Sequence, residues 1–215
     1  MRFILMVLLA FFVAGAAAAD ADRPLPSDQT YGVYRDGSRI GSRTTRFRHD
    51  GQDLIVETAT DIKVKLAFIT AYKRTERQTE VWREGRLMTM TSSIDDDGEE
   101  FRFELARGTN GLELVGKRSR AAIPEDALPA TYWNPATVSA TTLIDIKRGK
   151  ILTVETRPQG AESFPVDGVE VQTTKYALTG DRNMTLWYGP EGNLVRLQLV
   201  ASDGSDVVIR SRKAD

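Results

Sequence analysis

Carboxylate side chains between residues 93 and 104 have the spacing that a bound calcium ion would need. The string Ser93-Ile94-Asp95-Asp96-Asp97-Gly98, followed by Glu104, matches a twelve-residue calcium loop with ligands at positions 1, 3, 5 and 12 and glycine at position 6. Two positions do not fit, because position 1 is serine and position 8, which such loops keep apolar, is Glu100. The flanking residues alternate as strands do, so we expect a solvated hairpin tip and no metal site.

His49 is the single histidine of the chain and the first residue to consider as a general base. It lies in the turn sequence His49-Asp50-Gly51, where both polar side chains should face water. The chain has no G-x-S-x-G nucleophile elbow to accompany it. Carboxylates are abundant, but the sequence does not show which of them approach one another. We therefore assign no catalytic residue.

The string Tyr132-Trp133-Asn134-Pro135 is the least ordinary feature of the chain. Its two large aromatic residues suit a cap that closes one end of a sheet and buries its apolar face. They equally suit the mouth of an apolar pocket, and the sequence leaves both roles open. Tyr132, Trp133 and Asn134, together with Trp187, are our candidate ligand-binding residues.

Short alternating segments separated by glycine turns must position these residues. Val195, Leu197 and Leu199 are apolar, whereas Arg196 and Gln198 between them are polar, and residues 101–105 repeat the pattern. Such alternation predicts strands with one dry face and one wet face. Pairs such as Asp36-Gly37 supply the positive φ of hairpin turns. We predict a mainly β protein with a single curved antiparallel sheet, a half-barrel or open barrel of ten to thirteen strands.

Three segments deserve separate predictions. Residues 54–82 are expected to form two long bent strands joined near Ala71-Tyr72. Residues 119–148 contain three prolines and no glycine, and are expected to form helical turns near Pro124 and over residues 141–146 before a strand begins at Lys150. This segment should lie across the concave face or one open end as a plug. Residues 158–166 are expected to form a loop.

The N-terminal residues MRFILMVLLAFFVAGAAAA have the layout of a secretory signal peptide. Arg2 precedes an apolar run that decays into small residues, so we expect cleavage near Ala19, with Ala19-Asp20-Ala21 as a second site, and a periplasmic protein. The predicted organisation is a signal peptide over 1–19, a disordered leader over 20–29 and one β domain over 30–213.

Composition excludes several classes of partner and cofactor. The chain has 29 Lys and Arg against 30 Asp and Glu, a net charge of −1, so it lacks the basic face that a nucleic-acid partner requires. No second apolar stretch approaches bilayer length, so we expect no stable membrane anchor. The absence of cysteine excludes disulfides, thiolate chemistry and iron–sulfur clusters, and we expect no cofactor.

Several short strings occur in an order that resembles an uncharacterised family of exported proteins from Gram-negative bacteria. The strings are Tyr31-x-Val33, Asp36-Gly37, Ile40-Gly41, Glu80-x-Trp82, Gly85-x-Leu87, Tyr132-Trp133-Asn134-Pro135, Leu186-Trp187-Tyr188 and Gly192-x-Leu194. The Tyr-Trp-Asn-Pro string is the most specific. The resemblance implies one domain of unknown function from Tyr31 to about Arg210. The chain is also distantly similar to periplasmic β proteins of the lipoprotein-carrier type. It implies architecture, and no activity or catalytic residue.

These observations favour a non-enzymatic exported envelope protein that binds a lipid or another apolar or amphipathic ligand in the concave face of its sheet. The alternative is a structural or protein-interaction module whose hollow is filled by its own plug. An envelope hydrolase is the third interpretation and lacks a nucleophile signature.

Overall fold

The computed structural model describes residues 25–66, 69–109, 111–115 and 123–212. The predicted signal peptide, residues 20–24 of the predicted leader, residues 119–122 of the expected plug and Lys213 lie outside the described residues. No helix in the described part of the chain has the length and apolar character needed to cross a membrane.

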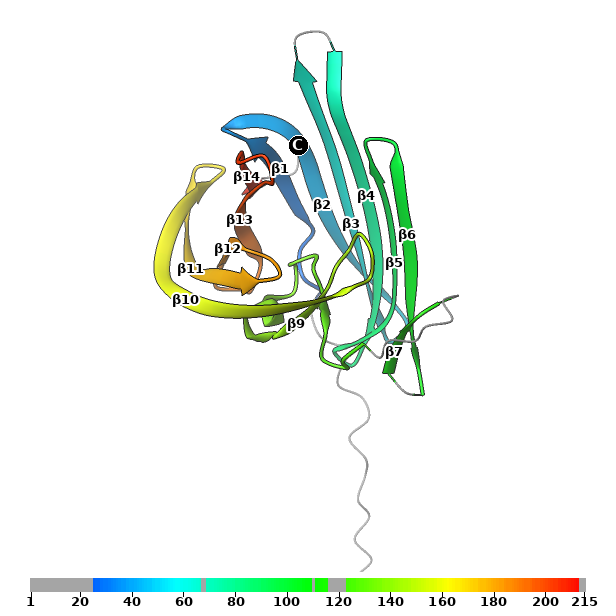
Figure 1. The fold of residues 1–215 in the computed structure, drawn as a ribbon. Coiled ribbons are helices and arrows are strands. Elements are labelled where there is room, and N and C mark those ends of the chain that lie inside the picture. The colour runs from blue at the N-terminus through cyan, green and yellow to red at the C-terminus, as the bar shows by residue number, and fades with distance from the viewer. Residues whose placement is uncertain (1–24, 67–68, 110, 116–122, 213–215) are drawn as a thin grey trace, which may run out of the picture.

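Strands make up most of the described chain (Figure 1). Those of the N-terminal half are β1 (Gln29–Arg35), β2 (Ser38–Asp50), β3 (Asp53–Leu66), β4 (Ile69–Arg83), β5 (Arg86–Asp96), β6 (Glu99–Gly108) and β7 (Gly111–Leu114). Those of the C-terminal half are β8 (Leu128–Pro129), β9 (Thr142–Ile144), β10 (Ile151–Val166), β11 (Val169–Gly180), β12 (Met184–Tyr188), β13 (Leu194–Val200) and β14 (Asp206–Arg212). A 3-10 helix, η1 (Pro135–Ser139), lies between β8 and β9.

The strands form one sheet of fourteen in the order β7-β6-β5-β4-β3-β2-β1-β14-β13-β12-β11-β10-β9-β8. Consecutive strands pair with one another, except β7 with β8, and β1 also pairs with β14 and thereby joins the two halves. The pairs are antiparallel apart from β8 with β9. The sheet is curved (Figure 1). It does not close into a barrel, because β7 and β8, the two ends of the strand order, do not pair with each other. The predicted single curved sheet is confirmed, with one strand more than the range expected.

Four of the hairpins turn through two residues that both have positive φ, the conformation of a type I′ turn. Asp36-Gly37, Glu84-Gly85, Asp97-Gly98 and Asp167-Gly168 occupy these turns. The acidic string at 93–98 is therefore the end of one strand and a hairpin tip, as its sequence indicated. β3 ends at Leu66 and β4 begins at Ile69, so Ala71 and Tyr72, the predicted junction, lie within β4.

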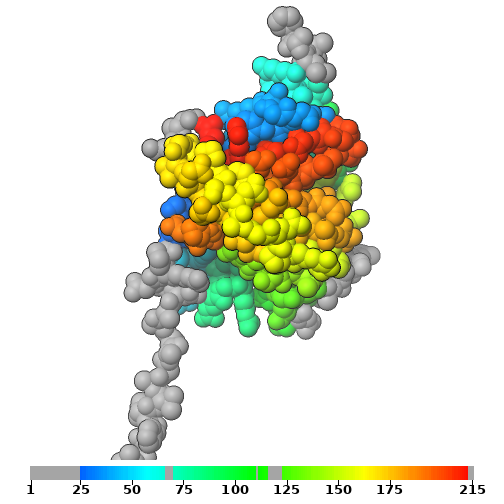
Figure 2. All heavy atoms as spheres, turned by 90° about the vertical axis from the view of Figure 1, so that its left-hand side faces the viewer, coloured from blue at the N-terminus to red at the C-terminus, as the bar shows by residue number. Residues whose placement is uncertain are grey.

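Residues 158–166 are part of the long strand β10, so the predicted loop is wrong. Prolines at 158 and 165 suggested a break, because proline cannot donate to a sheet ladder. Beyond Val154, whose backbone N–H donates to the carbonyl of Thr141, β10 pairs only with β11, and its other edge is open; these two strands lie on the face that Figure 2 shows. A proline on such an edge sacrifices no ladder bond, and a bulge between Pro158 and Gly160 absorbs the irregularity.

The predicted helical turns also differ from the structure. Residues 125–126 form a turn, the helical segment lies at Pro135–Ser139, and Thr142–Ile144 is the strand β9. β9 pairs with Ile151–Thr153 of β10, and this pairing outweighs the weak helical pattern of the short run. Ile151 is the first residue of β10, one residue after the predicted start.

The plug segment, defined here as residues 123–149, fills one end of the sheet and lies between its two halves (Figure 1). It contributes to both apolar cores. The first core comprises Phe47, Val56, Trp82, Leu87, Met90, Leu105, Leu112, Ile123, Ala127, Trp133 and Ile144. The second comprises Tyr31, Ala130, Tyr132, Leu143, Val154, Leu178, Leu186, Tyr188, Leu194 and Leu197. The concave face is thus filled by the chain's own side chains at this end.

The opposite end of the sheet splits between β2 and β3. Their pairing ends at Gly41 and Ile62, although β2 continues along β1 and β3 continues along β4. At Gly41 the two backbones are so close that a Cβ atom would lie 2.1 Å from the carbonyl oxygen of Asp61. Glycine therefore permits the close approach from which the strands separate.

Replacing Gly41 with alanine should lower the free energy of unfolding by about 1–3 kcal/mol, because the added methyl group forces the strands apart. Gly108→Ala is the matched control, since its Cβ would meet its nearest neighbour at 3.8 Å, an ordinary contact. Urea denaturation of both variants measures the difference. Equal stabilities for the two variants would contradict the role assigned to Gly41.

Candidate functional site

The carboxyl group of Glu80 is the polar centre of the plugged end. Glu80 lies on β4 between Val56 of β3 and Met90 of β5, and no part of it is exposed. Its Oε2 accepts hydrogen bonds from the indole Nε1 of Trp82 and of Trp133, each at 2.9 Å. Its Oε1 accepts one from the Thr131 hydroxyl at 2.7 Å. Two of these three donors belong to the plug segment, so Glu80 fastens the plug to the sheet.

Burial raises the pKa of Glu80 above its ordinary value of 4.5, and the three donors and the positive charge of Arg43 oppose that rise. Arg43 is itself buried and donates from Nη2 to the backbone carbonyl of Thr131. The plug is therefore bound to the concave wall by both a carboxyl and a guanidinium group. Each would be costly to leave without a partner in the interior.

Trp133 is enclosed by aromatic rings in the first core. Its ring meets those of Phe47 and Trp82 edge to face, with centroids 5.4 and 5.7 Å away. Tyr132 enters the second core, and its backbone carbonyl accepts a 2.8 Å hydrogen bond from the Tyr188 hydroxyl. A positive φ of 61° at Tyr132, unusual for a bulky residue, sends the two neighbouring side chains into different cores. The geometry is that of a cap.

Asn134 has a local structural role. Its side-chain oxygen accepts a 2.9 Å hydrogen bond from the backbone N–H of Ala136 and so caps the N-terminus of η1. The structure thus brings Tyr132, Trp133 and Asn134 together at the plug, but as packing and capping groups.

Trp187 lies on the other face of the sheet, away from Tyr132 and Trp133. Its neighbours Leu186 and Tyr188 belong to the second core, whereas the Trp187 indole donates to Glu162 at 2.9 Å. The ring also packs edge to face against Phe164, at 5.7 Å between centroids. The structure does not join Trp187 to the other three candidate residues.

The middle of the concave wall on β2–β5 is polar, which the prediction of one dry face did not anticipate. Buried polar side chains form this band: Arg43, Thr45, Thr58, Thr60, Glu76, Gln78 and Ser92. The hydroxyls of Thr45 and Thr58 are 3.4 Å apart, and Ser92 donates to the carbonyl of Ile146 at 2.6 Å. Threonine suits strands whichever face it occupies, so its presence did not identify the band.

The residues considered first for chemistry are dispersed. His49 is exposed near the end of β2. Asp96 is paired with Arg74 and Lys147, each at 2.7 Å, and these ion pairs contribute to lowering its pKa to about 2, although burial opposes the shift. No cluster of histidine and carboxylate groups able to hold a metal occurs in residues 25–66, 69–109, 111–115 and 123–212.

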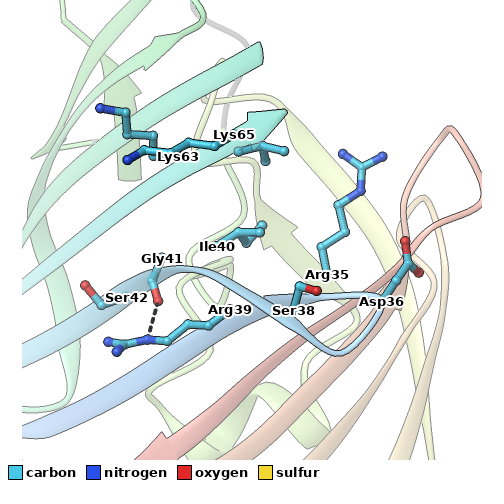
Figure 3. A pocket seen from close by; sticks show the side chains of 10 residues that line it. Arg35, Asp36, Ser38, Arg39, Ile40, Gly41, Ser42, Lys63 and Lys65 are labelled. Carbon is cyan, nitrogen blue, oxygen red and sulfur yellow. Dashed lines mark hydrogen bonds between the residues drawn. The ribbon is translucent and has the colours of Figure 1, made fainter. Parts of the chain in front are cut away.

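A cleft of about 680 Å³ lies where β2 and β3 separate (Figure 3). Ile40 and Val64 provide apolar surface, and Arg39, Lys63 and Lys65 provide positive charge. Figure 3 shows the two lysines extending from β3 on one side and Arg39 lying along β2 on the other. Sequence reasoning missed this site. The alternation in Lys63-Val64-Lys65 was a signal, but the divergence of the strands was not visible in the sequence.

The cleft is far from the predicted aromatic site. Val56, beside Glu80, and Ile62, at the start of the split, are six residues apart on β3, or roughly 20 Å at the rise of a strand. The polar band lies between them. The concave face therefore has a filled end and, separated from it, an end with a cleft.

The fold and the site define a mainly β, barrel-like protein with an open sheet and an internal plug. The chain belongs to the family with the domain of unknown function DUF6134, whose model matches residues 31–212. It is similar in structure to a beta-barrel-like protein of the domain of unknown function DUF1849 from Brucella abortus, with a TM-score of 0.57 and 12% sequence identity. The match covers 90% of this chain and 98% of that one, and shows the fold alone. A sequence comparison with curated proteins gives no match.

Replacing Glu80 with glutamine should change how stability depends on pH. Because the pKa of Glu80 is raised in the folded protein, the folded protein keeps a proton on this carboxyl above about pH 4.5, where the unfolded chain releases it. The wild type should therefore lose stability relative to Glu80→Gln as the pH rises from 4.5 toward the folded-state pKa. Melting temperatures between pH 4 and 8 measure this difference. Exposed Glu99→Gln is the control, and parallel curves for Glu80→Gln and wild type would contradict the raised pKa.

Removing the indole donor of Trp133 should be costlier than removing that of Trp187. Trp133→Phe leaves the enclosed Glu80 without one donor, at a cost of about 1–3 kcal/mol in unfolding free energy. Trp187→Phe removes a bond of equal length to Glu162, whose side chain is 42% exposed and can bind water instead. Chemical denaturation compares the two variants. A larger loss in Trp187→Phe would contradict the anchoring role of Glu80.

Proposed function

We propose that this protein is a non-enzymatic binding protein of the bacterial periplasm, and that it holds an amphipathic molecule in the cleft between β2 and β3. The cleft is the observation that carries this proposal. Its volume of about 680 Å³ is within the range of roughly 300–1,000 Å³ that small-molecule sites occupy.

The plugged end is a poorer candidate for the ligand. Tyr132 is 7% and Trp133 9% exposed, and both are held by hydrogen bonds to neighbouring strands. A ligand entering there would have to displace aromatic packing and leave Glu80 without partners. At the cleft, in contrast, Ile40 and Val64 are only half-buried, and a ligand reaches them without displacing aromatic packing.

The enclosure of Glu80 supports a role without catalysis. A raised carboxyl pKa is what a general acid needs, but this carboxyl is wholly buried and accepts three hydrogen bonds from neighbouring side chains. Its geometry suits holding the plug in place. His49 is exposed near the end of β2 and does not line the cleft.

The alternative, an interaction module, has one observation in its favour, the self-filled core at the plugged end. Such modules often bind a partner strand along an open sheet edge. The open edge of β10 contains Pro158 and Pro165, and proline on an edge discourages strand addition. We therefore rank this alternative second.

The periplasmic location is proposed from the N-terminal sequence. A basic residue, an apolar run and small residues before Asp20 form the arrangement that signal peptidase recognises. The intact mass of protein recovered from a periplasmic fraction tests this, since cleavage removes residues 1–19.

Native mass spectrometry of protein purified from the periplasm without detergent tests the binding function. We expect an additional mass that organic solvent extracts. Val64→Trp should fill the cleft and remove this mass, whereas Val169→Trp, at a residue 66% exposed in the β10–β11 hairpin, should retain it. A bare wild-type mass, or an additional mass retained by Val64→Trp, would count against the cleft as the site.

A further inference from the structure

We infer that the cleft selects an amphiphile with an anionic headgroup, a phosphate ester or carboxylate, and that Lys63, Lys65 and Arg39 bind that headgroup. This inference depends on the proposed function and specifies its ligand. The three cations line a single cleft, two from β3 and one from the facing part of β2 (Figure 3). Phosphate and carboxylate oxygens are the groups that lysine and arginine recognise in such an arrangement.

Three of the four cations that line the cleft have no ion-pair partner among the described residues. No carboxylate forms an ion pair with Arg39, Lys63 or Lys65 within the described residues. Asp36 also lines the cleft, but one of its carboxylate oxygens accepts a 2.9 Å hydrogen bond from the backbone N–H of Asp206. Arg35 is paired with Asp203 and contributes less to the free positive charge.

The carboxylate on β3 that is nearest to Lys63 in the sequence, Asp61, also has a partner. Asp61 forms a bidentate pair with Arg77 of β4, at 2.8 and 3.0 Å. The Asp61 carboxylate is therefore paired with a different cation, although only Ile62 separates it from Lys63 in the sequence. The hydrogen bond from Asp206 leaves the negative charge of Asp36 in place, but Arg39, Lys63 and Lys65 outnumber that single carboxylate, so the cleft keeps a net positive charge.

A like-charge pair beside the cleft strengthens the inference. Lys63 lies directly opposite Lys73 in the antiparallel pairing of β3 with β4. Like charges in directly opposed positions destabilise a sheet, so local stability does not explain this arrangement. An anion bound nearby would relieve the repulsion, and an exception to a local rule is expected where function requires it.

The alternation of β3 separates the two kinds of contact. Val64 is half-buried, whereas Lys63 and Lys65 on either side of it are exposed. Consecutive side chains of a strand project to opposite faces. An amphiphile whose alkyl chain packs against Val64 would therefore place its headgroup near Lys63 and Lys65 at the rim of the cleft. The same strand thus contacts both parts of an amphiphile.

The test compares probes with the same alkyl chain and different headgroups. Isothermal titration calorimetry at low ionic strength measures binding of dodecyl phosphate and dodecyl maltoside below their micelle concentrations, and of inorganic phosphate alone. We expect dodecyl phosphate to bind about tenfold more tightly than the maltoside, and inorganic phosphate to bind far more weakly than either. The double variant Lys63→Glu/Lys65→Glu should lose about tenfold in affinity for dodecyl phosphate and keep its affinity for the maltoside.

A matched variant controls for net charge. Arg86→Glu/Lys150→Glu changes the charge by the same amount at exposed positions that do not line the cleft, and should bind dodecyl phosphate as the wild type does. Equal binding of the two alkyl probes, unaffected by the lysine substitutions, would overturn the anionic headgroup and leave the proposed function standing. Failure of both alkyl probes to bind would overturn the proposed function as well. Binding of inorganic phosphate as tight as that of dodecyl phosphate would overturn the need for an alkyl chain.

Discussion

The buried carboxyl group of Glu80 is the constraint on which the plugged end depends. A carboxyl removed from water must be protonated or surrounded by donors, and this one has donors from Trp82, Thr131 and Trp133. Because two donors come from the plug segment, the cost of burying Glu80 is offset only when the plug is in place. The position of the plug is thereby specified more sharply than apolar contact alone would specify it.

The plug in turn explains how one sheet supports two apolar cores. The left-handed backbone of Tyr132 directs adjacent aromatic residues into separate clusters, one on each half of the sheet. The strand order places β7 and β8 at opposite ends without pairing them, so packing against the plug holds the two halves around a common interior. An open sheet of this size has no closed ladder to do so.

At the other end of the sheet, the separation of β2 from β3 depends on a local steric condition. Gly41 allows β2 and β3 to approach closely at their last shared pair, after which each strand follows a different neighbour. The divergence creates the cleft and places Arg39 opposite Lys63 and Lys65. Filling at one end and separation at the other are the reasons for which we propose the cleft, and not the aromatic string, as the ligand site.

The sequence by itself determined the class of fold and many of its turns. Strict alternation in segments such as residues 195–199 and glycines in two-residue turns are local properties, and they specify antiparallel strands without reference to distant residues. The plug was also recognisable, because prolines and adjacent aromatic residues interrupt that alternation. Strand assignment failed at Pro158 and over Thr142–Ile144, where the outcome depends on which edge is open and which strand lies alongside.

Only the tertiary structure decided where the candidate site lies. Glu80 was one carboxylate among thirty acidic residues until the fold enclosed it. Trp187 resembled Trp133 in type, but the register of β12 places it on the opposite face, since a shift of one residue along a strand reverses the side. The cleft joins residues from two strands that separate, and such a separation has no local signal. Long-range pairing determines whether a side chain is buried and which face of the sheet it occupies. These two properties determine what the side chain can bind.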